Sequence, residues 1–346
     1  PVLFGILLVT FILARLIPGE PCRAILGEKA THEACERFNQ ANGLDKSLPE
    51  QLVIYMGKVL RGDFGESIRF SRPVSIILIE RLPMTVELSL AALLIAIAIG
   101  IPAGIISAVR HNSRVDVVTM VGANIGVSMP VFWLGLMLAY VFALLLKDTP
   151  LWLPPSGRLT AGVSPTPFYE VYGLPLEKGT FWFNFFEFFA NLYIFNSIIT
   201  LNLEVLLDAI KHLILPATAL STIPMAIIAR MTRSSLLEVV GLDYMRTARA
   251  KGLPERLVFM RHAMKNAMLP IVTIIGLSLG GLLGGAVLTE TVFGLAGVGR
   301  TLFEAITARD YPIIQAFTVV IAVMFVVINL IVDLSYAYLD PRIRLG

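Results

Sequence analysis

The sequence has few charged residues. Only 15% of its 346 residues are Asp, Glu, Lys or Arg, whereas a soluble globular domain usually has about 25%. Hydrophobic residues make up 56% of the chain, and the mean hydropathy is +0.77. This composition excludes an ordinary soluble domain and predicts an all-α integral membrane protein.

The sequence also lacks the motifs of nucleotide and metal chemistry. It contains no G-x-x-x-x-G-K-[ST] and no H-E-x-x-H, and its four histidines all fall outside the long apolar segments. The net charge is only +3, and the basic residues form no patch interleaved with aromatic side chains, which argues against a nucleic-acid ligand. We therefore expect no enzyme activity, no cofactor and no metal in this chain.

Long apolar runs are what the sequence does have. A helix needs about 20 mostly apolar residues to cross a bilayer core of about 30 Å. Six segments fit, if the first is taken as truncated, because the chain starts inside an apolar run with no charged leader or cleavage site. The predicted spans are 1–17, 87–109, 117–146, 213–231, 267–288 and 313–336.

The charges of the connecting loops predict the orientation. The segment 232–266 has seven Lys or Arg and three acids, whereas 147–208 has three Lys or Arg and six acids. Basic loops remain in the cytoplasm, so we expect 232–266 and both chain termini inside. The predicted organisation is a first helix in 1–18, an external cap in 19–82 and a five-helix core in 83–346 that includes the external insertion 147–208.

Both cysteines, Cys22 and Cys35, fall in the expected external cap. On an oxidising face we expect a disulfide between them, with two free thiols as the alternative. The pair has no further Cys or His at ligand spacing, so it is weak evidence for a metal.

The insertion contains the aromatic stretch FWFNFFEFFANLYIFN. Its polar interruptions argue against a seventh span, and we expect a helix in the outer membrane interface, where aromatic rings are enriched. The fifth span has Gly276, Gly280 and Gly284 at spacings of four, which permit close helix approach. This seam faces either a pore or another subunit, or packs within the chain.

The stretch 243–253, DYMRTARAKGL, has the signals of a short capped helix. Asp243 is the expected N-cap, and Gly252 the expected left-handed residue after the helix end. Between them, 244–251 would form about two turns, roughly 12 Å long. Pro254 is expected at the first position of a second helix. A solvated basic loop would explain the charges but not the caps.

At this point the residues resemble a known family. The segment DYMRTARAKGLPERLVFMRHAMKNAMLP is similar to the EAA loop of ABC importer permeases, most closely to the first permease subunit of dipeptide/oligopeptide importers. The motifs RLIPGEP, LRGDFGES, LPPSGR and TETVFGLAGVGRTLFEAI extend this likeness, in order, over most of the chain. Where the general motif has Glu-Ala-Ala, this chain has Arg246, Thr247 and Ala248.

The resemblance implies a type I ABC importer permease in the plasma (inner) membrane of a bacterium or archaeon. Its expected partners are a second homologous permease, two ATPase subunits that hold ATP and Mg, an extracytoplasmic substrate-binding protein and a peptide substrate. The segment that couples to the ATPase would be Asp243, Tyr244, Met245, Arg246, Thr247, Ala248, Arg249, Ala250, Lys251, Gly252 and Leu253. Within it, Tyr244, Met245 and Ala248 would make the apolar contacts with the partner.

Other functions stay open on the sequence alone. Similar permeases serve nickel, glutathione or oligosaccharides. An ion-coupled secondary transporter is a rival from another class, but such carriers need ionisable groups at mid-membrane, and the predicted spans have almost none. A channel or structural subunit is a third class, and it would need no capped cytoplasmic helix.

Overall fold

The computed structural model describes residues 2–16, 31–43 and 45–339. These residues form helices and connecting loops, with no strand among them beyond one isolated bridge. The helices are α1 (Val2–Leu16), α3 (His32–Asn42), α4 (Leu48–Leu60), α5 (Val74–Val109), α6 (Arg114–Ser128), α7 (Val131–Ala139), η1 (Tyr140–Leu145), α8 (Phe168–Val171), α9 (Phe181–Ala190), α10 (Tyr193–Ile199), α11 (Leu203–Val240), α12 (Asp243–Ala250), α13 (Glu255–Leu257), η2 (Val258–Ala263), α14 (Met264–Leu283), α15 (Val287–Val292), α16 (Val298–Ala308) and α17 (Tyr311–Leu339).

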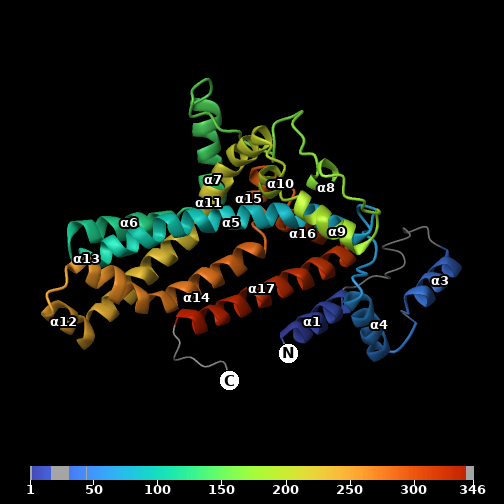
Figure 1. Cartoon of the computed structure of the whole chain (residues 1–346). Coiled ribbons are helices and arrows are strands. Elements are labelled where there is room, and N and C mark those ends of the chain that lie inside the picture. Colours follow the sequence, from blue (N-terminus) through green and yellow to red (C-terminus); the bar gives the residue numbers. More distant parts are fainter. Residues whose placement is uncertain (1, 17–30, 44, 340–346) are drawn as a thin grey trace.

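The long helices run side by side along one axis (Figure 1). Helices α12 and α13 lie at one end of this bundle, and α3, α4, α8 and α9 lie at the other. We refer to these as the α12 end and the α9 end. The all-helical prediction is therefore confirmed.

Within the described residues, four helices are long and apolar enough to cross a membrane: 74–109, 203–240, 255–283 and 311–336. A fifth span is reached only if the bent pair 114–128 and 131–145 counts as one. The apolar part of α1, Leu3–Ile12, is shorter than a span. The six-span count therefore stays a prediction, although four of the predicted segments coincide in large part with these helices.

The expectation of one continuous helix over 117–146 is wrong. The chain bends by 95° between α6 and α7. Pro130 is the cause, because its ring disfavours the helical conformation of the residue before it, and Met129 is extended with φ −81° and ψ 131°. Pro130 itself has φ −58° and ψ 127° and precedes the first residue of α7.

Helices α5 and α11 form the centre of the bundle and approach each other closely. A Cβ atom on Gly100 would lie 2.7 Å from the carbonyl oxygen of Met225, and one on Gly104 would lie 2.6 Å from that of Ala229. Backbones this close leave no room for a side chain at either glycine. Small residues on one face of α5 thus allow the backbones of α5 and α11 to approach closely.

The glycines of α14 pack within the chain. A Cβ atom on Gly276 would lie 2.1 Å from a side-chain carbon of Val332, and one on Gly280 would lie 2.5 Å from the ring of Phe325, both on α17. Gly284 has only its own turn within reach. The structure places Gly276 and Gly280 in an intramolecular contact between α14 and α17.

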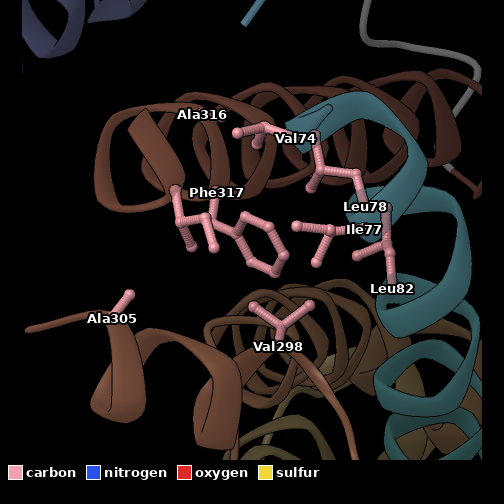
Figure 2. Close-up of a cluster of buried hydrophobic side chains, with 9 residues drawn as sticks. Val74, Ile77, Leu78, Leu82, Val298, Ala305, Ala316 and Phe317 are labelled. Carbon is pink, nitrogen blue, oxygen red and sulfur yellow. The ribbon is translucent and has the colours of Figure 1, made fainter. Parts of the chain in front are cut away.

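A hydrophobic cluster joins the first turns of α5 to α16 and α17 (Figure 2). Phe317 is fully buried at its centre, between Ile77 of α5 and Val298 of α16. The stretch between α14 and α17 contains two short helices, α15 and α16, and α16 packs in this cluster through Val298 and Ala305.

The aromatic stretch is divided into α9 and α10, which are too short for a span. The expectation of a single helix there is wrong, since the chain breaks at Asn191 and Leu192. One side of α9 packs with Phe168 and Tyr169, whereas Phe181 and Trp182 remain exposed. The Tyr169 hydroxyl donates a hydrogen bond to the Glu187 carboxylate at 2.5 Å.

Only one of the two cysteines of the predicted disulfide is among the described residues. Cys35 lies on α3, but Cys22 is outside the described residues. The Cys22–Cys35 pairing stays a prediction.

Candidate functional site

The predicted short helix is present as α12, but its N-cap is displaced by one residue. Leu242 is the N-cap, with ψ 152°, and Asp243 is the first helical residue. The Asp243 side chain is 96% exposed and lies 3.5 Å from the Arg246 guanidinium, so it caps no backbone N–H. The prediction of Asp243 as N-cap is wrong, although its charge in the first turn still favours the helix dipole.

The C-terminal end of α12 follows the prediction. Gly252 comes directly after the C-cap Lys251 and has φ +74°. Its N–H donates to the carbonyl of Arg249 at 2.9 Å. A Cβ atom there would meet nothing within 4 Å, so the requirement for glycine comes from the left-handed backbone and not from crowding.

The next helix starts one residue later than expected. Pro254 is its N-cap and not its first residue, and Glu255 begins α13. The Glu255 carboxylate accepts a hydrogen bond from Arg249 Nε at 2.9 Å, which links the two helices across the turn at Gly252. The chain then continues through the π-helical η2 into α14.

Met245 and Ala248 are buried in the chain itself. They are 0% and 7% exposed, and they pack with Ala108 of α5 and with Leu236 and Val239 of α11. The prediction that these two side chains contact a partner is wrong in this structure. They fix α12 to the ends of α5 and α11 instead.

The opposite face of α12 is exposed and mixed in character, with a small excess of basic residues. Tyr244 is 39% exposed, and its hydroxyl accepts a hydrogen bond from Asn266 Nδ2 at 2.7 Å. The exposed residues are Leu242, Asp243, Tyr244, Arg246, Thr247, Ala250, Lys251 and Gly252, with Arg249 and Leu253 half-buried. The helix is held from one side, and its other face has three basic residues and one acid, with Arg246 paired to Asp243 and Arg249 to Glu255. A net basic face of this kind is suited to bind an acidic surface.

A buried ion pair lies next to the base of α12 and was missed in the sequence. Arg233 of α11 binds Asp116 of α6 with two nitrogens, Nε and Nη2, each 2.8 Å from a different carboxylate oxygen. Asp116 also accepts from the Ser107 hydroxyl and from the N–H of Asn112 at 3.0 Å. The partners are far apart in sequence, and no local pattern pairs them.

Two half-buried carboxylates lie toward the α9 end. Glu87 of α5 accepts a hydrogen bond from Arg158 Nη2 at 2.9 Å, and the Arg158 guanidinium stacks 3.6 Å from the Tyr193 ring centre. Nearby, Thr160 donates through both its N–H and its hydroxyl to Asp208 of α11, at 2.7 Å each. The segment 157–160 thus joins α5 to α11.

Glu290 holds the α15–α16 pair against α5. Its carboxylate accepts from the Thr85 hydroxyl and from the N–H of Arg300, both at 2.8 Å. Thr85 in turn accepts from the N–H of Val298 at 2.8 Å. Gly297 fits beside them only without a side chain, because a Cβ there would lie 2.5 Å from the Thr85 hydroxyl.

The described part of the chain has no group of three or more His, Cys, Asp or Glu placed to hold a metal ion. The four carboxylates described above, Asp116, Glu87, Asp208 and Glu290, each accept hydrogen bonds. They serve to join helices, and the exposed face of α12 is the strongest candidate for contact with another molecule.

Comparison with known proteins shows the family of the chain. The family described as "Binding-protein-dependent transport system inner membrane component" matches residues 100–345, and its N-terminal counterpart matches residues 2–91. The chain is 45% identical to a dipeptide transport system permease protein of Alkalihalophilus pseudofirmus, over 99% of this chain and 96% of the relative.

Two further relatives are a di/tripeptide transport system permease protein of Pseudomonas aeruginosa and a dipeptide transport system permease protein of Escherichia coli. They are 41% and 40% identical, each over 99% of this chain and 95% of their own length. With apolar helices long enough to cross a membrane and family matches over nearly its whole length, the chain belongs to the inner membrane components of binding-protein-dependent transport systems.

Proposed function

We propose that this chain is the permease subunit of an ATP-driven ABC importer for dipeptides or short oligopeptides. The observation that carries the proposal is α12, a short helix fixed to the chain by Met245 and Ala248 with its opposite face exposed. The names of the relatives, which cite dipeptide and di/tripeptide transport, support the substrate class.

The proposed topology has six spans, with the α12 end in the cytoplasm. The basic excess of 232–266 supports this orientation, since basic loops are retained inside. Both termini would then be cytoplasmic. The cap 19–82 and the insertion 147–208 would lie outside, with α9 at the outer membrane interface.

The proposed partners supply what the sequence lacks. Two ATPase subunits would bind ATP and Mg, because this chain has no Walker A motif. A second homologous permease would complete the translocation path, and an extracytoplasmic binding protein would deliver the peptide. This chain would itself catalyse no reaction.

We propose a mechanical role for α12. When an ATPase subunit moves, it would displace α12, whose buried residues rest on the ends of α5 and α11. Because α5 and α11 are in close backbone contact at Gly100 and Gly104, the two helices would move together. Motion at the α12 end would thereby reach the α9 end, where the binding protein releases the peptide.

The test is purification followed by reconstitution. A tagged chain expressed in its host should co-purify with a second permease and two ATPase subunits. In liposomes, the complex should take up labelled alanyl-alanine only with binding protein and ATP–Mg both present. Uptake driven by an ion gradient without ATP would refute the proposal in favour of a secondary transporter. Uptake of nickel, glutathione or an oligosaccharide in place of peptides would refute the substrate class alone.

A further inference from the structure

Asp116 is the most fully bound carboxylate near α12. It is 4% exposed, and its two oxygens accept four hydrogen bonds: two from Arg233, one from the Ser107 hydroxyl and one from the Asn112 N–H. A two-point contact between guanidinium and carboxylate fixes distance and orientation together. The pair therefore holds its helices in one relative position.

The donors come from separate elements. Ser107 is in the last turn of α5, Asn112 is in the following turn, and Arg233 is on α11. Asp116 itself is in the first turn of α6, behind the N-cap Ser113. One carboxylate thus connects the start of α6 to the ends of both helices that support α12.

The pair is adjacent to the surface on which α12 rests. Ala108, next to Ser107, packs with Met245, and Leu236, one turn beyond Arg233, belongs to the same buried cluster. Any movement of α12 that shifts the ends of α5 and α11 therefore acts on Asp116 as well. Without the pair, α6 would lose the two-point ionic contact that fixes its position against α11.

A purely stabilising role explains the pair less well. Exchanging a buried ion pair for apolar residues of similar size often leaves stability unchanged or raises it. Arg230, one turn earlier on α11, is exposed and forms no ion pair with a described residue. Of these two arginines of α11, only Arg233 is paired with an acid of the described chain. Pairing is therefore a specific property of Arg233 and not a general one of the basic residues at this end of α11.

Building on the proposed function, we propose that Asp116 and Arg233 form a positioning pair that transmits the displacement of α12 to α6 and, through the bend at Pro130, to α7. The pair makes α5, α6 and α11 one unit at the α12 end. ATP hydrolysis would then drive the α7 segment as well as the central helices.

The experiment compares variants in the reconstituted complex. Peptide uptake and ATP hydrolysis are measured together for D116N and R233M, with R230M as the matched control. We expect the ratio of alanyl-alanine transported to ATP hydrolysed to fall about fivefold or more, the lower end of typical coupling between sites, while R230M keeps the wild-type ratio. Wild-type ratios in D116N and R233M would overturn the proposal, even if both activities fall together.

A second variant covers failure to assemble. R233K keeps the charge but loses the two-point geometry, so its ratio should also lie below that of R230M. If D116N and R233M do not assemble, a wild-type ratio in R233K overturns the proposal.

A covalent link separates a mechanical role from a structural one. The double variant Asp116→Cys/Arg233→Cys should have a lowered ratio, and joining the two introduced thiols with a short bifunctional reagent should restore it. The parent chain treated with the same reagent is the control, because Cys22 and Cys35 are present in both. A ratio that stays low after linking overturns the mechanical role.

The experiment distinguishes failure of the positioning role from failure of the proposed function. If the wild-type complex shows no ATP-dependent uptake, the proposed function itself fails. If the wild type couples normally and the variants do as well, only the positioning role fails.

Discussion

Replacing Met245 with alanine distinguishes an anchor from a partner contact. Met245 is fully buried against α5 and α11, so Met245→Ala removes buried side-chain atoms and leaves a cavity. Substitutions of this type cost about 2–5 kcal/mol of stability. Because the surrounding helices are joined at Asp116, the site has little freedom to collapse, and we expect a loss within this range. Tyr244, on the exposed side of the same helix, is the matched comparison.

The assay has two parts. Thermal unfolding of the purified permease should shift to lower temperature for Met245→Ala and change little for Tyr244→Ala. Binding to the ATPase subunits should respond in the opposite order, with Tyr244→Ala the more damaging. If Met245→Ala leaves the isolated chain as stable as wild type but weakens ATPase binding, Met245 faces the partner and the burial argument is refuted.

Three further predictions follow from local geometry. Gly252→Val should uncouple uptake from ATP hydrolysis, because the backbone φ of +74° costs a β-branched residue about 1–3 kcal/mol. Gly252→Asn should be tolerated, because asparagine adopts this conformation more readily. Equal coupling in the two variants would contradict this prediction. Gly276→Ala should lower the unfolding temperature and Gly281→Ala should not, since only the first would meet another side chain; equal shifts would refute it. Burial and the Glu187 carboxylate raise the pKa of the Tyr169 phenol, so its contribution to stability is complete below about pH 10 and is lost as the pH rises further. A Tyr169→Phe variant should therefore lose less stability than wild type in that alkaline range. Parallel losses in the two proteins would contradict this prediction.

Local features of α12 were predictable because they depend on adjacent residues. Gly252 was assigned correctly, since a left-handed position after a helix strongly favours glycine. Asp243 was misplaced by one position, because Leu242 has the non-helical backbone of the N-cap. Helix boundaries commonly differ by one or two residues from those expected. Met245 and Ala248 were assigned correctly to the apolar side of α12, whereas Tyr244 was not, because it lies on the exposed side.

What that apolar side contacts could not be predicted. Periodicity places Met245 and Ala248 on one face, but it does not tell whether the face meets the same chain or a partner. Asp116 and Arg233 are 117 residues apart in the sequence, so their pairing becomes evident only in the three-dimensional structure.

The break at Pro130 illustrates the same limit. Prolines at other positions, such as Pro216 and Pro224, lie inside α11 without ending it. A proline therefore marks a candidate bend, and the packing of neighbouring helices determines whether the helix continues.

The length of α11 has a consequence of its own. Its 38 residues make a rod about 57 Å long, whereas the hydrocarbon core is about 30 Å thick. Even with tilt, the rod extends beyond the lipid tails. If it pivots about its midpoint, a rotation of about 10° moves each tip by about 5 Å, close to one helical turn. The helix acts as a lever, so a small tilt in the membrane becomes a displacement large enough to change which side chains meet at its two ends.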